Sequence, residues 1–338
     1  MDLNVIWFIL IGFLFAGYAL LDGFDLGVGG LHLFTKSDKE RRIMLNAIGP
    51  VWDGNEVWLV TGGGALFAAF PIVYATVFSG FYLAFMLLLL LLIFRAISIE
   101  FRSKQPMKWW RSMWDVAFSV SSVLSGFVIG VALGNLVWGI PLGADGEFQG
   151  SFLSLFHPYS LMTGIMTVAL FMMHGSIYIV LKTEGDLHNR VREWVRNTII
   201  FFIISYVVVT MLTLLYVPHM AQPLKDHPIL FSIPLINLLA IANIPREIFF
   251  GRDGRAFLSS CVAILALMAL FAIGLFPNLV ISHPYPEYSL TIWNASSTTK
   301  TLKIMLTMAL IGMPIVLAYT VSIYWIFRGK VKLEPMGY

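Results

Sequence analysis

Long apolar stretches alternate with short charged segments along nearly the whole sequence. A transmembrane helix needs about 20 mainly apolar residues to cross a hydrocarbon core about 30 Å thick. The pattern therefore predicts nine membrane-spanning helices. They cover residues 5–33, 51–70, 74–99, 116–138, 159–181, 198–217, 229–244, 256–281 and 304–327.

Two of these stretches are less regular than the others. The seventh is short and contains Pro234, Asn237 and Asn243. The second and third are separated only around Pro71, which is compatible with a turn or with a kink in one long helix. Hydropathy alone therefore leaves the number of spans open.

The positions of the basic residues decide between these topologies. Cytoplasmic loops of membrane proteins are enriched in Lys and Arg. If the N-terminus is outside, all of the 22 Lys and Arg except Lys225, Lys300, Lys303 and Arg95 lie on the cytoplasmic side. Merging the second and third stretches, or omitting the seventh, would scatter the basic residues over both sides. We therefore expect an all-α polytopic membrane protein with its C-terminus in the cytoplasm, and one domain over residues 1–338.

The composition supports a membrane protein and excludes several other classes. Hydrophobic residues make up 58% and charged residues 12% of the chain, against about 45–50% and about 25% in soluble domains. The net charge of +3 comes from dispersed loops that face lipid headgroups, so nucleic acid is not an expected partner. Cys261 is the one cysteine, which excludes an intramolecular disulfide and favours packing as its role.

Ionisable residues inside the predicted spans are the main candidates for function. A charge near the bilayer centre costs at least ~2.5–3.5 kcal/mol on insertion scales and requires a partner or a function. In the predicted orientation, three consecutive spans bring such residues to the inner leaflet. They are Asp22 and Asp25 in the first span, Asp53 and Glu56 in the second, and Arg95 and Glu100 in the third.

This cluster has two interpretations. Carboxylates whose proton affinity is tuned by burial and pairing can relay protons from the cytoplasm. Alternatively, a buried pair of Asp53 and Arg95 would only clamp the second and third spans. Asp22 and Glu100 lie nearer the headgroups, where we expect solvated or interfacial side chains. Asp25 lies deeper.

Aromatic and histidine residues in the spans add fewer constraints. Trp52 and Trp58 flank the acids, where tryptophan is typical of an interfacial anchor, and lining a ligand is the alternative. His174 lies well inside the fifth span, and neutral imidazole is a common haem ligand. The other histidines fall at span ends or loops, so a second axial ligand is missing. We therefore predict a hydrogen-bonded or pore-lining His174 and no metal site.

Several segments of this sequence are similar to one family over essentially the whole chain. The N-terminal block contains DGFD (22–25), WDGNEVW (52–58), FSGFY (78–82) and RAISIEFRSK (95–104), and later segments include RSMWD, GVALGNL, GDLHNR and SLTIWNASSTTKTL. With these segments the chain resembles subunit II of cytochrome bd-type quinol oxidases, including the cyanide-insensitive group.

The resemblance implies a fold, a partner and an activity. It implies nine helices arranged as two four-helix bundles plus one peripheral helix, in a heterodimer with subunit I in a prokaryotic cell membrane. Subunit I of that family holds two b-type haems, haem d and the quinol-oxidising loop, so His174 is not expected to bind iron. The implied reaction couples quinol oxidation to reduction of dioxygen to water, is electrogenic without pumping, and needs both subunits.

The resemblance also assigns roles to single residues. Asp25, Asp53, Arg95 and Glu100 match positions proposed for proton supply, and Glu56 lies beside them. Trp58 matches a tryptophan near a hydrophobic dioxygen passage, and Trp52 adjoins it as a further dioxygen- or quinone-lining candidate. A structural quinone and a small single-helix accessory subunit are found with some members. The chain departs from the pattern of some members at Val51, which replaces a histidine, and in its shorter C-terminal half.

Two other function classes remain as alternatives. Intramembrane acids and glycine-rich spans also occur in proton-coupled secondary transporters, which have inverted repeats and a substrate site near the bilayer midplane. The sequence shows no corresponding halves, and the acids gather at one leaflet. A purely structural scaffold subunit is the third class, and it requires that the acids form only ion pairs.

Overall fold

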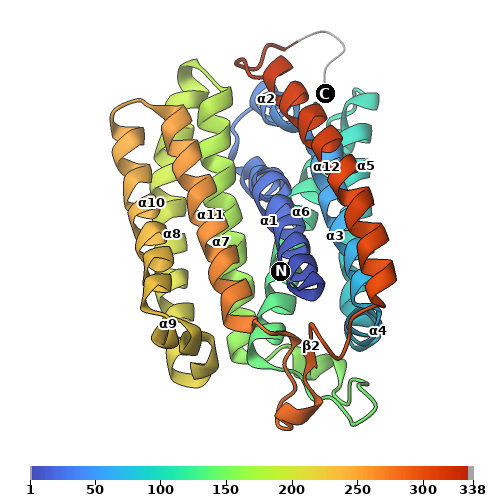
Figure 1. The fold of residues 1–338 in the computed structure, drawn as a ribbon. Helices are drawn as coiled ribbons and strands as arrows, with labels where there is room; N and C mark the ends of the chain where they lie inside the picture. Colours follow the sequence, from blue (N-terminus) through green and yellow to red (C-terminus); the bar gives the residue numbers. More distant parts are fainter. Residues whose placement is uncertain (1, 334–338) are drawn as a thin grey trace.

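The computed structural model describes residues 2–333, and these residues are almost entirely helical (Figure 1). The α-helices are α1 (Leu3–Leu31), α2 (Asp38–Ile48), α3 (Trp52–Ala69), α4 (Pro71–Gly80), α5 (Tyr82–Phe101), α6 (Lys108–Trp138), α7 (Pro158–Lys182), α8 (Gly185–Tyr216), α9 (Gln222–Asp226), α10 (Ser232–Phe249), α11 (Asp253–Leu275) and α12 (Thr299–Ile326). Two short strands, β1 (Asn278–Val280) and β2 (Leu290–Thr291), pair in antiparallel fashion. Short 3-10 turns are η1 (His32–Phe34), η2 (Arg102–Lys104), η3 (Phe152–Leu155), η4 (Pro218–Ala221), η5 (Pro228–Phe231) and η6 (Pro286–Tyr288).

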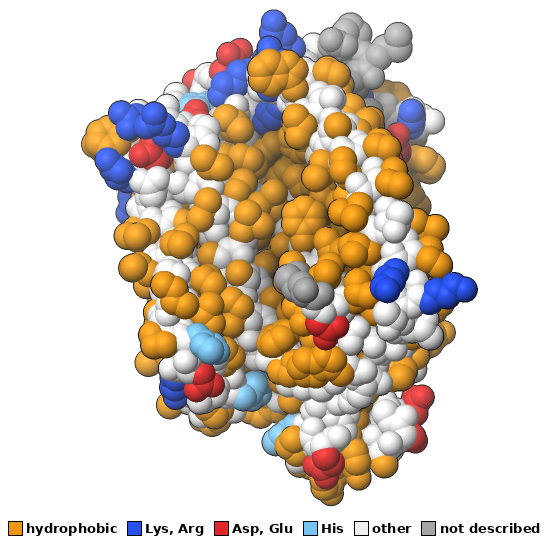
Figure 2. Space-filling model, in the orientation of Figure 1, with side chains coloured by type: hydrophobic (Ala, Val, Ile, Leu, Met, Phe, Trp, Pro, Cys, Tyr) orange, Lys and Arg blue, Asp and Glu red, His pale blue; other side chains and the backbone are white. Residues whose placement is uncertain are grey.

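The long helices run side by side between two ends of the molecule, which we name after the element found at each (Figure 1). The α2 end holds α2 and the last turns of α1, α5 and α12. The hairpin end holds β1, β2 and the first turn of α12, where the Ser297 amide donates to the Ala69 carbonyl at the end of α3. Lys and Arg side chains gather over the α2 end, and hydrophobic side chains cover most of the face between the two ends (Figure 2).

Eight helices in the described part of the chain are long and apolar enough to cross a membrane. They are α1, α5, α6, α7, α8, α10, α11 and α12. The prediction of an all-helical, multi-pass membrane protein is therefore confirmed. The predicted second span corresponds to α3, whose 18 residues begin with a polar turn that contains Asp53, Asn55 and Glu56.

The predicted third span, residues 74–99, is wrong in one respect, because it covers two helices. One helix ends at Gly80, and α5 begins at Tyr82. The chain also turns before Pro71, which is the first residue of α4. Proline is favoured at that position because its fixed φ suits a helix and its missing N–H would have no partner there. Pro71 therefore starts a new helix and does not kink a continuous one.

Helix α7 lies at the centre of the molecule and packs against α1, α6, α8 and α11. Its closest approach is to α1, where Gly175 lies against the backbone at Gly27. Helix α12 packs mainly against α1 and α3 (Figure 1). Its one buried residue is Leu302, near the hairpin end.

Candidate functional site

Three ionisable side chains on α1 point in the same direction. Tyr18, Asp22 and Asp25 are spaced by four and three residues, so they share one face of the helix. Asp22 and Asp25 are fully buried, and Tyr18 is nearly so. Asp25 lies six residues before the end of α1, about 9 Å from that end at a rise of about 1.5 Å per residue. The acids are therefore within the helical bundle and not at its surface.

Arg95 of α5 is the counterion of these acids, and it is also fully buried. Its guanidinium donates two parallel hydrogen bonds to the carboxylate of Asp22, from Nη1 to Oδ2 at 2.9 Å and from Nη2 to Oδ1. The Asp25 carboxylate lies farther away, with Oδ2 at 4.0 Å from Nη2. Glu56 of α3 approaches from the rim, with Oε2 at 3.8 Å from Nη1 and a side chain that is 21% exposed.

Asn55 of α3 connects this cluster to the outermost helix. Its Nδ2 donates to Oδ2 of Asp25 at 2.8 Å and to the Leu21 carbonyl at 3.3 Å. Its Oδ1 accepts a hydrogen bond from the hydroxyl of Tyr324 on α12 at 2.9 Å. Four helices, α1, α3, α5 and α12, therefore contribute to one buried polar cluster.

The charges in this cluster do not balance if every carboxyl group is ionised. The two-fold hydrogen bonding leaves Asp22 and Arg95 as a neutral pair. Asp25 and Glu56 then have no further cation within hydrogen-bond distance in the described part of the chain. Oδ1 of Asp25, Nε of Arg95 and the hydroxyl of Tyr18 are buried and have no hydrogen-bond partner among the described residues. A proton on Asp25 or on Glu56 would reduce this excess of negative charge.

A second ionic cluster lies closer to the α2 end. There Asp115 of α6 contacts two arginines and one histidine. Its Oδ1 contacts Nε2 of His32 at 2.6 Å and Nε of Arg102 at 2.5 Å. Its Oδ2 accepts from Arg41 at 2.8 Å. Arg102 also reaches Asp38 of α2 at 2.7 Å. This cluster joins α2 to the ends of α1, α5 and α6.

The structure corrects two expectations about the acids. Arg95 pairs with Asp22 and not with Asp53, whose side chain is exposed in the first turn of α3. Asp22 is fully buried and not solvated, and it lies farther from the α2 end than Asp25. Both errors come from using depth along the chain without the rotation of each helix. Glu100 is half-buried in the last turn of α5.

Sequence reasoning missed Asn55, Tyr324 and the Asp115 cluster. Asn55 was detectable, since it lies within the same WDGNEVW segment as the candidate acids. Tyr324 had no sequence signal, because a tyrosine near the end of a span is common at the membrane interface. Asp115 and Arg102 lie at the ends of predicted spans, where the sequence is equally compatible with solvated loop charges.

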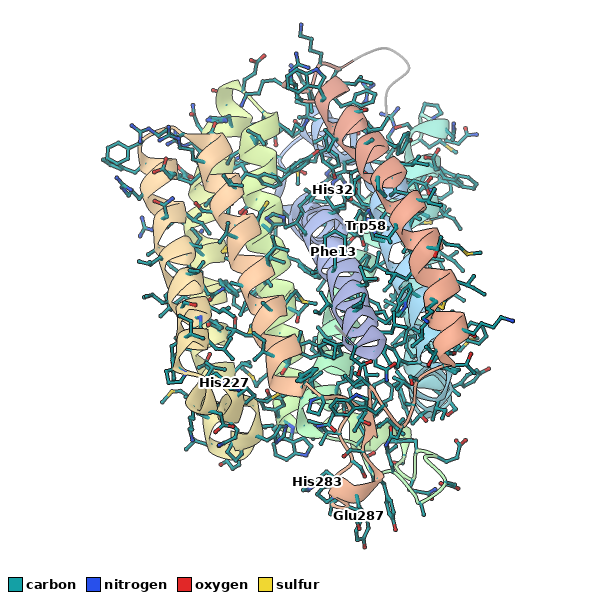
Figure 3. The ribbon with its side chains drawn as sticks, viewed as in Figure 1. Phe13, His32, Trp58, His227, His283 and Glu287 are labelled. Carbon is teal, nitrogen blue, oxygen red and sulfur yellow. The ribbon has the colours of Figure 1, made fainter. Side chains whose placement is uncertain are left out.

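The two tryptophans near the acids are buried, so they are not simple interfacial anchors. Trp52 is 8% exposed and packs in the main apolar core. Trp58 is 6% exposed and packs with Leu14 and Tyr18 of α1. The ring of Phe13 meets that of Trp58 edge-on, with centroids 5.9 Å apart (Figure 3).

His174 does not fit a haem ligand in this structure. It is fully buried, and both ring nitrogens are engaged: Nδ1 with the Ser260 hydroxyl at 2.8 Å and Nε2 with the Leu20 carbonyl at 3.0 Å. Its ring stacks on Phe257 of α11. The described residues also contain no group of three His, Cys, Asp or Glu side chains that could hold a metal ion. A haem iron bound to His174 would have to displace one of these two partners, because a single ring nitrogen would coordinate it.

Comparison with known proteins identifies the family. The model of the family described as cytochrome bd terminal oxidase subunit II matches residues 3–327. The chain belongs to this family. It is 34% identical to cytochrome bd-I ubiquinol oxidase subunit 2 of Escherichia coli (strain K12), with 99% of this chain and 96% of that protein covered. It is 36% identical to cytochrome bd ubiquinol oxidase subunit 2 of Bacillus subtilis (strain 168), with 100% and 99% covered.

A solved structure shares the fold. The bd oxidase from Geobacillus thermodenitrificans contains a chain that superposes with a TM-score of 0.78 at 17% identity, covering 97% of this chain and 98% of that one. The expected family is thus confirmed, and the chain is a subunit II of a cytochrome bd-type terminal oxidase, a multi-pass protein of the bacterial cell membrane. The clusters described above therefore belong to a subunit of a respiratory oxidoreductase.

Proposed function

We propose that this subunit binds no haem, pairs with subunit I, and supplies protons from the cytoplasm for the reduction of dioxygen to water by quinol. The E. coli and B. subtilis relatives are named ubiquinol oxidases, which supports quinol as the electron donor. The engaged ring of His174 supports placing both b-type haems and haem d in subunit I. Quinol oxidation would then be electrogenic without a pump, because protons for water formation come from the cytoplasmic side.

We propose that the α2 end faces the cytoplasm and that α3 is a ninth span. The clustering of Lys and Arg over the α2 end supports this orientation (Figure 2). Hydrogen bonds near both ends of α3, to the Asn55 side chain and to the Ala69 carbonyl, support a helix that runs between the two ends. In this arrangement α1, α3, α5 and α6 form one four-helix bundle, α7, α8, α10 and α11 form the other, and α12 is peripheral.

One observation carries the proton-supply proposal: Arg95 neutralises Asp22 and leaves the fully buried Asp25 beside it. A buried carboxylate with no cation of its own is costly, so Asp25 takes up a proton. Its hydrogen bond from Asn55 makes the ionised form accessible as well. Asp25 is therefore the group that exchanges a proton in the interior.

The remaining candidates lie on the route between this acid and the α2 end. Glu56 is partly exposed and lies next to Arg95, so it can pass a proton between the surface and the cluster. Asp53 is exposed one turn closer to the α2 end and would collect protons there. Glu100 lies in the last turn of α5, which is also at the α2 end. Tyr18 lies one turn deeper than Asp22, on the side away from the cytoplasm.

The test is to purify the complex of both subunits with Asp25→Asn and to measure quinol-dependent dioxygen consumption together with the haem spectrum. We expect a large loss of turnover with a normal haem spectrum. Asp53→Asn should lower turnover less, because exposed neighbours can replace a surface proton acceptor. Asp145→Asn, in an exposed loop at the hairpin end, is the matched control. Unchanged turnover in Asp25→Asn would refute proton supply through this acid.

A structural role is the second candidate function, and the Asp22–Arg95 pair favours it. A buried pair between α1 and α5 holds the two helices together whether or not a proton moves through the cluster. Loss of the haems from the Asp25→Asn complex would indicate that the cluster serves assembly. The dioxygen- or quinone-lining roles of Trp52 and Trp58, the structural quinone, and the small accessory subunit stay predictions.

A further inference from the structure

The outermost helix, α12, is fastened to the bundle at its α2 end by polar contacts, beside partly buried packing of Ile323 and Tyr324 on the main core. None of its residues near that end is buried. Nζ of Lys182, at the end of α7, donates to the Phe327 carbonyl just after α12. The Val331 amide donates to the Lys182 carbonyl at 2.9 Å. The third contact is the Tyr324 hydroxyl on Asn55, which is the one that reaches the ionic cluster.

The hydrogen bonds of Asn55 have a defined polarity. The Leu21 carbonyl can only accept, and the ionised Asp25 carboxylate can only accept, so the NH2 group of Asn55 must face them. The Asn55 oxygen then faces α12, and the Tyr324 hydroxyl must donate to it. Tyr324 thus holds the amide in the orientation that presents a donor to Asp25. Without that hydroxyl, the Asn55 oxygen loses this donor, and outside the bond to Asp25 only the longer contact with the Leu21 carbonyl, at 3.3 Å, still orients the amide.

We propose that Tyr324 is a positioning residue that sets the proton affinity of Asp25 through Asn55, so that docking of the α12 end controls proton exchange at this acid. A hydrogen bond donated to a carboxylate favours its ionised form. Loss of the Tyr324 hydroxyl therefore makes Asp25 hold its proton more tightly. This inference rests on the proposed role of Asp25 in proton supply and adds its regulation by α12.

Other charged or titratable groups also face Asp25, and Tyr324→Phe leaves all of them in place. They are Asp22 on α1, Glu56 on α3, Arg95 on α5 and Tyr178 on α7. Arg95 keeps its two hydrogen bonds to Asp22. A change in the titration of Asp25 in this variant therefore reports the Asn55 contact.

The experiment uses the purified two-subunit complex and infrared difference spectroscopy of carboxyl groups as a function of pH. The C=O stretch that disappears in Asp25→Asn is assigned to Asp25. In Tyr324→Phe we expect that band to move and its titration midpoint to rise by about one pH unit, about tenfold in proton affinity. Tyr319→Phe, on the same helix and 64% exposed, should leave the band and the midpoint unchanged.

A double variant separates positioning from a general loosening of the helix. Asn55→Leu removes the amide, so it should raise the midpoint by itself. Adding Tyr324→Phe to Asn55→Leu should then raise it no further. If the two shifts simply add, Tyr324 does not act through Asn55 and the inference is wrong.

The outcomes distinguish this inference from the proposed function. An unchanged band and an unchanged pH profile of turnover in Tyr324→Phe would overturn the inference while leaving Asp25 as the proton carrier. Normal turnover in Asp25→Asn would overturn the proposed function, whatever Tyr324→Phe does to the band. If Tyr324→Phe prevents assembly, Lys182→Met loosens the same helix end without altering Asn55. A wild-type midpoint in that variant would overturn control by α12 docking.

Discussion

Arg95 on α5 and Asp22 on α1 form a two-fold hydrogen-bonded ion pair in which neither side chain is exposed to solvent. The two residues are 73 positions apart in the sequence. Their pairing brings the third predicted span against the first, although the chain passes through α3 and α4 in between. It also leaves Asp25 without a cation within hydrogen-bond distance among the described residues.

Removing one member of this pair should destabilise the complex strongly. Arg95→Met leaves Asp22 buried without its cation, which costs about 3–5 kcal/mol in comparable buried pairs. The double variant Asp22→Leu, Arg95→Met removes both charges and should recover most of that loss. Thermal midpoints of the purified complexes test this. A single variant as stable as the wild type would show that the pair does not hold α1 to α5.

The crossing of α1 and α7 should tolerate no side chain at Gly175. A Cβ there would lie 2.6 Å from the Gly27 carbonyl carbon and 2.6 Å from the Val28 nitrogen, both of which are backbone atoms. Gly175→Ala must separate the helices, at about 1–3 kcal/mol for overpacking. Gly12→Ala is the control, since nothing lies within 4 Å of its Cβ position. We expect a lower thermal midpoint only for Gly175→Ala.

His157 at the hairpin end should make stability depend on pH. Its Nδ1 accepts a hydrogen bond from the Ser160 amide and caps α7, and Nε2 is buried without a partner in the described residues. Burial lowers the pKa of His157 from 6.5. The unfolded chain therefore takes up the proton first as pH falls.

The contribution of His157 to the free energy of unfolding is thus complete above pH 6.5. It is lost progressively as the pH falls toward the lower pKa of the folded state. His157→Asn keeps a capping side chain but removes the titration. The difference in thermal midpoint between pH 7.5 and pH 5 should therefore be smaller in His157→Asn than in the wild type. Equal differences in the two proteins would contradict this assignment.

Asp115 should be essential to the α2 end, whereas its neighbour Asp38 should not. Asp115→Ala leaves the buried Arg102 and His32 without their shared partner, and breaking a buried pair costs about 3–5 kcal/mol. Asp38 is 47% exposed, so Asp38→Ala should cost only about 0–1 kcal/mol. Proteolysis of the α1–α2 connection in purified complexes would measure the local loosening. Similar cleavage rates in both variants would refute the distinction.

The sequence by itself determined the class of this protein. Apolar stretches of membrane-spanning length and the low charge content predict a helical membrane protein, because a backbone in lipid must satisfy its hydrogen bonds within each helix. The WDGNEVW and DGFD segments indicated the family, and the asymmetry of Lys and Arg predicted the orientation. The proximity of Asp25, Glu56 and Arg95 to one another also followed from their positions along the spans.

Only the tertiary structure decided how these residues are paired. Hydropathy gives the depth of a residue in the membrane but not the rotation or the neighbours of its helix, so Asp22, Asp53 and Glu56 were equally suitable partners for Arg95. Helix packing directed Asp22 inward and left Asp53 exposed. It also brought Tyr324 to Asn55 across 269 positions of sequence. Such contacts depend on the arrangement of α12 against α3, which no local pattern encodes.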